Sequence, residues 1–306
     1  MSGLNSSNHD KHLIVIIGST AVGKTALSIH LAKELGTEII SADSRQFYKE
    51  LTIGTAKPGS EELNTVKHHF IGNISINDYY NAYKFETEAL DTLNNIFSTH
   101  KHAVMVGGSG LYINAVCDGI DELPDYDKPL REELENTFKT KGIEELRLQL
   151  KKLDPDYYAT VDLANPKRLM RAIEVCLQTG KTYSSLRINE AKERDFKTTK
   201  IGLNREREEL YDIINRRVDM MIERGLVDEA RKLYEYRSLN ALNTVGYKEL
   251  FHYFDNKISL EYAIEKIKTN TRRYAKRQLT WFNKDKAINW FHPDETEKIK
   301  TFIYNV

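Results

Sequence analysis

The sequence predicts an α/β fold built on a parallel sheet, and three observations lead to this prediction. An apolar run at 13–17 has the length and composition of a strand that is buried on both faces. Residues 24–35 then place apolar side chains at helical spacing before Gly36, which is a helix stop signal. Two further strand-like runs each end in a polar or glycine-rich loop. Strands that alternate with helices form parallel sheets, whose ligands bind at the carboxyl ends of the strands.

The remaining elements follow in order along the chain. The two further strands, at 38–42 and 103–106, end at Asp43 and at Gly107. Strand signals then disappear, and charged helical patterns replace them at 143–153 and 166–177. After these come a strand at 199–203, helices at 206–224 and 259–282, and a last strand at 287–291.

This order predicts a core with a helical insertion domain. We expect the core to comprise 10–120 and 200–306 and the insertion to comprise 121–199. The segment before the first strand is polar through His12, and the apolar run is too short for a signal segment or for the ~20-residue span that a membrane helix needs. We therefore expect a cytoplasmic protein that does not contact a membrane.

The loop between the first strand and the first helix carries the most specific motif. Gly18-x4-Gly23-Lys24-Thr25 fits the pattern G-x-x-x-x-G-K-[ST], in which backbone amides surround phosphate oxygens and the lysine adds positive charge. The Thr25 hydroxyl is the candidate ligand for Mg²⁺, and the helix N-terminus adds its positive dipole end. The core is therefore expected to resemble that of the P-loop NTPases.

A nucleotide hydrolase should also carry an aspartate at the end of an apolar strand to hold Mg²⁺, yet the strand at 103–106 ends in two glycines. The carboxylate that does follow a strand is Asp43. It is placed to accept a proton from an incoming nucleophile, or else to cap a following helix, and the residues alone leave both interpretations open.

The glycine-rich segment Gly107-Gly108-Ser109-Gly110 also has two interpretations. Its amides and the Ser109 hydroxyl would suit a second phosphate or a nucleic-acid backbone. A close strand-to-helix turn would need the same glycines.

Basic residues are concentrated in two places, although the chain as a whole balances 45 basic against 45 acidic residues. Residues 264–282 contain one acid, Glu265, and six cationic residues: Lys266, Lys268, Arg272, Arg273, Lys276 and Arg277. A smaller basic group, Lys167, Arg168 and Arg171, lies in the insertion. Nucleic-acid contact and a solvated surface both explain such groups; Arg272 and Lys276 are the candidate contacts on the long helix.

The ordered motifs resemble the tRNA dimethylallyltransferase family from Ile16 to about His292. The segments that carry the resemblance are 18–25, 41–48, 53–58, 107–112, 153–155, 165–168, 217–218 with 225–226, 246–249 and 271–278. The chain ends soon after the core, without the zinc-finger extension of some eukaryotic relatives, so the resemblance is to the bacterial type. It implies transfer of a dimethylallyl group from dimethylallyl diphosphate to N6 of the adenosine 3′-adjacent to the anticodon of tRNA.

The resemblance also implies roles for individual residues. Asp43 would be the base, Thr20 would lie near the reacting centre, and Arg217 would be a further diphosphate partner. The diphosphate would be held by Gly18, Ser19, Thr20, Ala21, Val22, Gly23, Lys24 and Thr25. The anticodon stem-loop would meet Asp43, Ser44, Arg45, Gln46, Ser109, Lys167, Arg168, Leu169, Met170 and Arg171. We expect a monomer that uses Mg²⁺.

Three other functions remain as alternatives. An enzyme that prenylates free AMP would share the loop and Asp43, but would have less need of the basic surfaces. A P-loop small-molecule kinase would consume ATP without tRNA. A non-catalytic tRNA-binding module would have no reason to keep Lys24, Thr25 and Asp43 intact.

Overall fold

The computed structural model describes residues 11–188 and 190–306, which divide into two compact units. The core unit runs to Cys117 and resumes at Glu193–Val306, and the helical unit is Asp118–Lys192. Residues 1–10, which include most of the polar segment before the first strand, lie outside the described residues.

The expected insertion of 121–199 overlaps the helical unit, but residues 193–199 belong to the core. Arg194 donates hydrogen bonds to Glu86 and to the carbonyls of Ala115 and Val116, which are all core residues. Lys197 already begins the next strand of the sheet.

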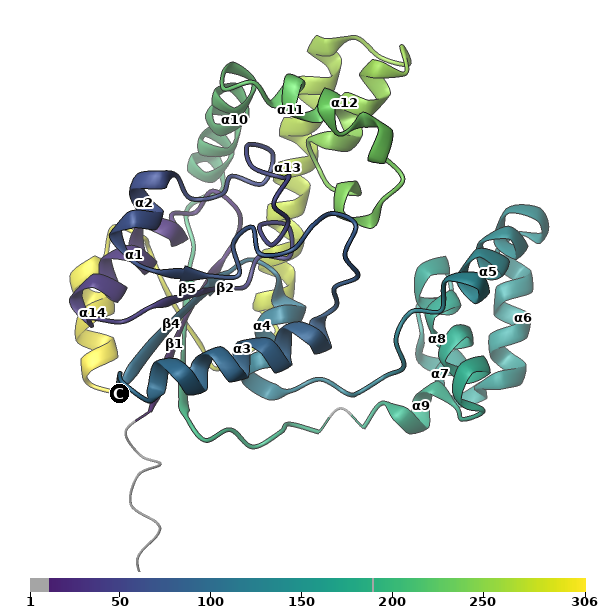
Figure 1. Cartoon of the computed structure of the whole chain (residues 1–306), viewed down its shortest axis with the longest axis horizontal. Coiled ribbons are helices and arrows are strands. Elements are labelled where there is room, and N and C mark those ends of the chain that lie inside the picture. The colour runs from purple at the N-terminus through teal and green to yellow at the C-terminus, as the bar shows by residue number, and fades with distance from the viewer. Residues whose placement is uncertain (1–10, 189) are drawn as a thin grey trace, which may run out of the picture. The chain divides into compact units, whose positions relative to one another are not determined.

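The core unit is built on one parallel six-stranded sheet with the order β3-β2-β4-β1-β5-β6 (Figure 1). The strands are β1 (His12–Gly18), β2 (Ile39–Ser41), β3 (His68–His69), β4 (His102–Gly107), β5 (Lys197–Leu203) and β6 (Ile288–Phe291). The five predicted strands are all present. The sixth, β3, is absent from the sequence prediction because two histidines carry no apolar strand pattern.

The central position of β1 in the sheet explains why its sequence is continuously apolar. It pairs with β4 on one edge and with β5 on the other. Leu13, Val15 and Ile17 pack into one core cluster, whereas Ile14 and Ile16 pack into another. Because alternate side chains of a strand point to opposite faces, a strand covered on both faces needs apolar residues at every position.

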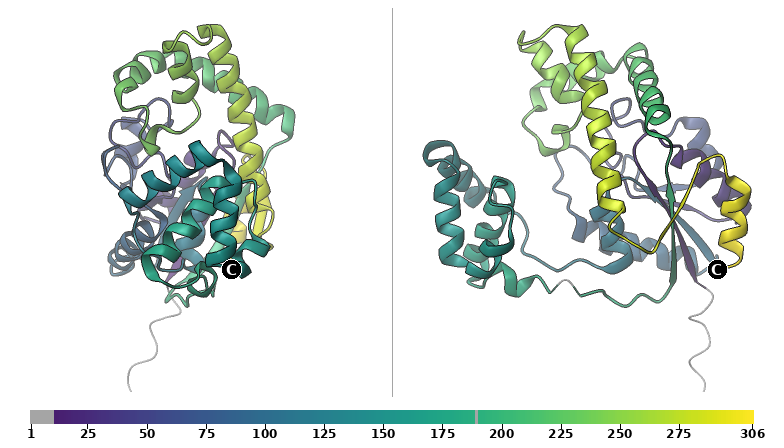
Figure 2. Two further views of the ribbon diagram at one scale, coloured as in Figure 1. Left: turned by 90° about the vertical axis from the view of Figure 1, so that its right-hand side faces the viewer. Right: turned by 180° about the vertical axis from the view of Figure 1, so that it is seen from behind.

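Helices cover both faces of this sheet (Figures 1 and 2). One cluster brings in α3 and α4, and the other brings in α1, α10 and α14. The helices of the core unit are α1 (Lys24–Glu34), α2 (Ser60–Thr65), α3 (Ala82–Phe97), α4 (Gly110–Asp118), α10 (Arg207–Glu223), α11 (Leu226–Lys232), α12 (Tyr247–Phe254), α13 (Leu260–Phe282) and α14 (Thr296–Tyr304), with short 3₁₀ turns η1 (Tyr234–Tyr236) and η2 (Asn240–Leu242).

Helix α13 connects the sheet to a smaller group of helices within the core unit. Its first half packs through Ala263 and Ile267 against α11 and α12. Its last residue, Phe282, packs on the face of the sheet that α3 and α4 cover. Figure 2 shows it as the long helix that runs from the α10–α12 region to the sheet. Among the described residues, no helix is long and apolar enough to cross a membrane.

The helical unit has its own small core. Its helices are α5 (Lys128–Lys141), α6 (Ile143–Leu153), α7 (Pro155–Thr160), α8 (Pro166–Thr179) and α9 (Tyr183–Leu186). Leu134, Leu146, Leu150 and Ile173 are buried together in its centre. Asp154 caps α7 through the Tyr157 amide and also accepts hydrogen bonds from the amide and hydroxyl of Ser184, so one buried carboxylate joins two helices.

Candidate active site

The loop between β1 and α1 has the backbone geometry of an anion site. Gly18 and Gly23 have φ of +149° and +111°, which L side chains rarely adopt, and a Cβ on Gly18 would lie 2.6 Å from the Leu203 carbonyl oxygen. Within the part of the chain that the structure describes, the amides of Ala21, Val22 and Gly23 have no hydrogen-bond acceptor. Free amides beside a helix N-terminus attract phosphate oxygens.

Lys24 lies across this loop. Its Nζ donates to the carbonyls of Gly18 at 3.1 Å and Ser19 at 2.7 Å. Burial lowers the pKa of Lys24 to about 8; Arg217 also lowers it, whereas Asp43 opposes the change. Burial lowers the pKa of the Arg217 guanidinium too, and again Asp43 opposes. Two half-buried cations therefore face one carboxylate, so the site has an excess of positive charge for an anion.

Asp43 follows β2, and no helix begins directly after it. Its Oδ1 accepts a 3.0 Å hydrogen bond from the Arg45 amide, which stabilises a turn over residues 44–47. The helix-capping interpretation is therefore wrong. The carboxylate also lines the cavity that contains the loop, as the proton-acceptor interpretation requires.

Two cavities adjoin at Asp43. The larger has a volume of 840 Å³ and is lined by the loop residues Thr20 to Thr25. The smaller has a volume of 520 Å³, and its lining includes Arg45, Lys248 and Arg277. Five residues line both: Thr20, Asp43, Thr55, Arg217 and Tyr274. Arg217 Nη1 donates a 3.2 Å hydrogen bond to Thr20 Oγ1 at this junction. The three predicted catalytic residues thus lie together where the cavities meet.

Gln278 of α13 is a site residue that the sequence analysis does not single out. It is 6% exposed, accepts a 2.8 Å hydrogen bond from the Thr20 amide and donates a 2.9 Å bond to the Gly108 carbonyl. It therefore fixes the loop against the β4–α4 turn. The only signal in the sequence is its position inside the motif at 271–278, because a glutamine on a helix carries no information about a partner so far away.

The glycines after β4 are explained by close packing. A Cβ on Gly107 would lie 2.3 Å from the Ala42 carbonyl oxygen, one on Gly108 2.2 Å from Gln278, and one on Gly110 2.2 Å from Trp281. The Ser109 amide donates to the Ala42 carbonyl, and its hydroxyl bonds to Ser44. The close-turn interpretation therefore explains the three glycines, and contact of Ser109 with a phosphate or a nucleic-acid backbone stays a prediction.

The side chains after Asp43 brace the surrounding loops. Arg45 Nη1 donates to the carbonyls of Asn240 and Ala241, at 2.9 and 3.2 Å. Gln46 donates to the carbonyls of Thr55 and Ala56, both at 3.2 Å. These side chains already have partners within the protein, so any contact they make with a ligand would be an additional one.

The basic residues of α13 have different environments. Arg272 is half-buried and donates to Asn215 Oδ1 of α10 at 2.6 Å, so part of its role is structural. Arg273 and Lys276 are exposed. Arg277 lines the smaller cavity and lies over the Tyr274 ring. Positive charge therefore extends along this helix from Arg277 at the smaller cavity.

In the helical unit, the predicted contact residues on α8 differ in whether they are exposed or buried. Lys167 and Arg168 are exposed in its first turn. Leu169 and Met170 are buried in the unit's core, at 0% and 5% exposure, so their side chains are not available to tRNA and the predicted contact stays a prediction for their backbone. Arg171 donates to the Pro124 carbonyl at 2.7 Å and pairs with buried Glu174, so it holds the segment before α5 in place.

The chain is similar to known proteins over most of its length. The sequence profile of the IPP transferase family matches residues 46–285. The chain is 55% identical to a tRNA dimethylallyltransferase of Christiangramia forsetii, over 94% of this chain and 95% of the relative. It is 51% identical to tRNA dimethylallyltransferase 1 of Bacteroides thetaiotaomicron, over 95% of this chain and 94% of the relative.

Solved structures are similar over the same extent. The tRNA isopentenylpyrophosphate transferase of Bacillus halodurans is 38% identical, with a TM-score of 0.70 over 97% of this chain and 96% of that one. A eukaryotic dimethylallyltransferase, whose structures describe it acting on tRNA, is 30% identical, with a TM-score of 0.77 over 92% of this chain and 74% of that one. The match of profile, relatives and fold over nearly the whole chain means that this protein belongs to the IPP transferase family.

Proposed function

We propose that this protein transfers a dimethylallyl group from dimethylallyl diphosphate to N6 of the adenosine 3′-adjacent to the anticodon of tRNA, giving N6-(dimethylallyl)adenosine and diphosphate. The observation that carries the proposal is the junction of two cavities at Asp43, Thr20 and Arg217. One cavity offers a diphosphate loop, and the other offers a separate entrance for an acceptor. The relatives named above are called tRNA dimethylallyltransferases, which supports the choice of substrates.

The diphosphate loop stabilises the leaving group. As the C1–O bond of the allylic diphosphate breaks, positive charge develops on the carbon and negative charge develops on the leaving oxygens. The free amides of residues 21–23, Lys24 and Arg217 face those oxygens and stabilise the charge that develops on them.

Asp43 accepts the proton that the nucleophile loses. The adenine N6 forms a bond to C1 of the dimethylallyl group, the diphosphate leaves with the C1–O electron pair, and Asp43 takes the N6 proton. An exocyclic amine is a weak nucleophile, so a positioned base contributes roughly 10²- to 10⁴-fold in rate. The hydroxyl of Thr20, held by Arg217, lies next to this reacting centre.

Mg²⁺ fits the larger cavity as an ion whose ligands come from both the protein and the diphosphate. The Thr25 hydroxyl lines the larger cavity, and the described residues contain no group of three or more metal-binding side chains, so the protein would supply few of the ligands. Mg²⁺ favours such sites because it retains waters and binds phosphate oxygens. When bound, the ion would neutralise charge on the diphosphate.

The tRNA contacts combine the rim of the smaller cavity with exposed cations. The target base must leave its stack to reach Asp43, so the protein must grip the anticodon stem-loop while the base is extruded. We assign this grip to Ser44, Arg45, Gln46, Ser109, Arg272 and Lys276 in the core unit and to Lys167 and Arg168 in the helical unit. We expect a cytoplasmic monomer, since tRNA is the acceptor and the residues assigned to the chemistry all come from one chain.

The test incubates the protein with Mg²⁺, labelled dimethylallyl diphosphate and unmodified tRNA, with AMP and ATP arms in parallel. Label on tRNA that maps to the adenosine beside the anticodon is the expected result. Label on AMP would instead assign the chemistry of an AMP isopentenyltransferase. ATP consumption without prenyl transfer would make the protein a small-molecule kinase.

A further inference from the structure

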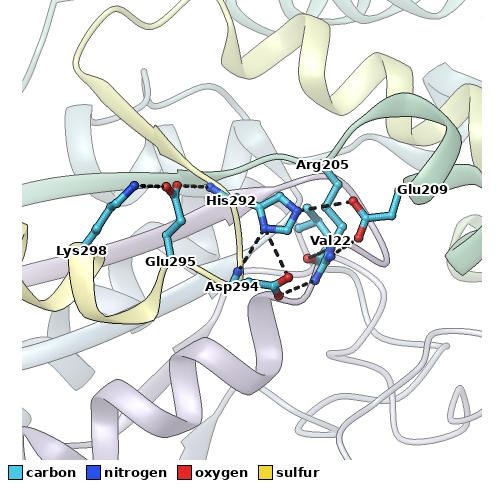
Figure 3. Close-up of polar contacts among 7 residues, drawn as sticks. All are labelled: Val22, Arg205, Glu209, His292, Asp294, Glu295 and Lys298. Atoms are coloured by element: carbon cyan, nitrogen blue, oxygen red, sulfur yellow. Dashed lines mark hydrogen bonds and ion pairs between the residues drawn. The ribbon is translucent and has the colours of Figure 1, made fainter.

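Arg205 contacts the diphosphate loop but does not line the larger cavity, and none of the proposed catalytic steps uses it. It lies between β5 and α10, and its side chain is 14% exposed. Its Nε donates a 3.2 Å hydrogen bond to the carbonyl oxygen of Val22. Figure 3 shows the guanidinium between that carbonyl and the carboxylates of Glu209 and Asp294.

This hydrogen bond determines the direction of the next amide. The described residues contain no cis peptide bond, so the Val22–Gly23 peptide is trans and its C=O and N–H point in opposite directions. With the Val22 carbonyl directed at Arg205, the Gly23 N–H points away from Arg205. Gly23 lines the larger cavity, and its amide is one of those without an acceptor in the described protein.

The guanidinium is itself held in a fixed orientation. Nη1 pairs with Glu209 in the first turn of α10, and Nη2 lies 3.4 Å from Asp294 in the loop after β6. His292 adds a 3.4 Å contact to Glu209. The same loop packs on the backbone that Arg205 holds, since a Cβ on Gly23 would lie 3.4 Å from Pro293. Each of the three guanidinium nitrogens thus has a partner.

We propose that Arg205 is a positioning residue for the donor substrate: by holding the Val22 carbonyl it aims the Gly23 amide at the diphosphate. This inference rests on the proposed function only in naming dimethylallyl diphosphate as the donor. The interaction matters for orientation more than for stability. Glu209 and Asp294 are 41% and 74% exposed, and ion pairs of such exposure contribute little to folding.

The experiment compares Arg205→Ala with Arg207→Ala. Arg207 lies two positions further on, and its guanidinium lies over the Tyr211 ring and makes no hydrogen bond to the loop among the described residues, so its removal deletes the same charge without touching Val22. For each protein we would measure KM for dimethylallyl diphosphate, KM for tRNA, kcat, the Kd of inorganic pyrophosphate by calorimetry, and Tm.

We expect Arg205→Ala to raise both the donor KM and the pyrophosphate Kd by about tenfold, as is typical for loss of a charge-assisted hydrogen bond. The tRNA KM, kcat and Tm should stay close to wild type, and Arg207→Ala should change none of these values by more than about twofold.

Three results would overturn the inference: an unchanged pyrophosphate Kd in Arg205→Ala, an equal rise in Arg207→Ala, or a joint rise of both KM values with a large fall in Tm. If the wild-type protein transfers no dimethylallyl group, the proposed function fails, and the pyrophosphate measurement still decides the role of Arg205.

Discussion

The guanidinium of Arg217 and the hydroxyl of Thr20 are joined by a 3.2 Å hydrogen bond, although the two residues lie 197 positions apart. Thr20 belongs to the diphosphate loop and Arg217 to α10, and both line the two cavities. The bond therefore connects the loop that we propose to bind the leaving group to a helix that borders both cavities. Changes on either side of this junction should have separable effects on donor use, on chemistry and on tRNA binding.

Asp43→Asn should separate chemistry from binding. The amide keeps the shape of the side chain and can still accept from the Arg45 amide, but it cannot take the N6 proton. We expect single-turnover transfer to slow by roughly 10²- to 10⁴-fold with unchanged tRNA affinity. A wild-type rate in this variant would remove Asp43 as the base.

Donor use should depend on the protonation of Lys24. Its pKa is lowered to about 8, so the free enzyme loses this positive charge as pH rises through that value. We expect kcat/KM for dimethylallyl diphosphate to be constant below pH 7 and to fall about tenfold for each pH unit above the pKa. The measurement is initial rates at low donor and saturating tRNA. A flat profile to pH 9.5 would contradict this assignment.

Gln278→Leu should weaken both the fold and the loop. The substitution leaves the Thr20 amide and the Gly108 carbonyl without their partner, and each unsatisfied buried group costs about 1–3 kcal/mol. We expect the free energy of unfolding to fall by about 2–4 kcal/mol and the donor KM to rise. Both tryptophans, Trp281 and Trp290, are in the core unit, so their fluorescence in urea reports this transition.

Thr280→Ala is the matched control on the same helix. Thr280 is exposed and donates only to the Lys276 carbonyl of its own helix. Its removal should change the free energy of unfolding by less than about 0.5 kcal/mol. Equal effects of the two substitutions would mean that Gln278 has no special role.

Lys276→Ala should weaken tRNA binding without changing donor use. Lys276 is exposed on the basic face of α13, and loss of one phosphate contact reduces the slope of log Kd against log salt by about 1. Filter binding between 50 and 200 mM salt measures this slope. Lys298→Ala on α14 is the control, because Lys298 is also exposed but pairs with Glu295.

If both lysine variants keep the wild-type slope, α13 does not contact the tRNA backbone. The acceptor would then be held by the cavity rim and by Lys167 and Arg168 of the helical unit. A fall of equal size in both variants would indicate a general effect of net charge instead.

The sequence predicts those parts of this structure that depend on local patterns. Continuous apolar runs identify β1 and β4, and the loop motif identifies the turn with free amides at 21–23, because buried strands and such loops impose their residue types over a few consecutive positions. Asp43 is found for the same reason, at the end of a recognisable strand. These features need no knowledge of distant contacts.

Distant contacts account for what the sequence analysis misses. Gln278 and Arg205 touch the loop from 258 and 183 positions away, and nothing near either residue indicates such a partner. Leu169 and Met170 show the opposite case: they lie within a motif assigned to tRNA, but their side chains face the core of their unit. A motif marks a segment, whereas only the packing shows which side of it is available.

The position of β5 has a consequence for biosynthesis. β1 pairs with β5, and His12 lies opposite Lys197, so the first strand made by the ribosome keeps one open edge until the helical unit has been synthesised. The Thr20 amide gains its hydrogen-bond acceptor even later, when Gln278 has been synthesised. A nascent chain with an uncovered apolar strand is prone to aggregate. Efficient production of this protein should therefore depend on chaperones that shield β1 during translation.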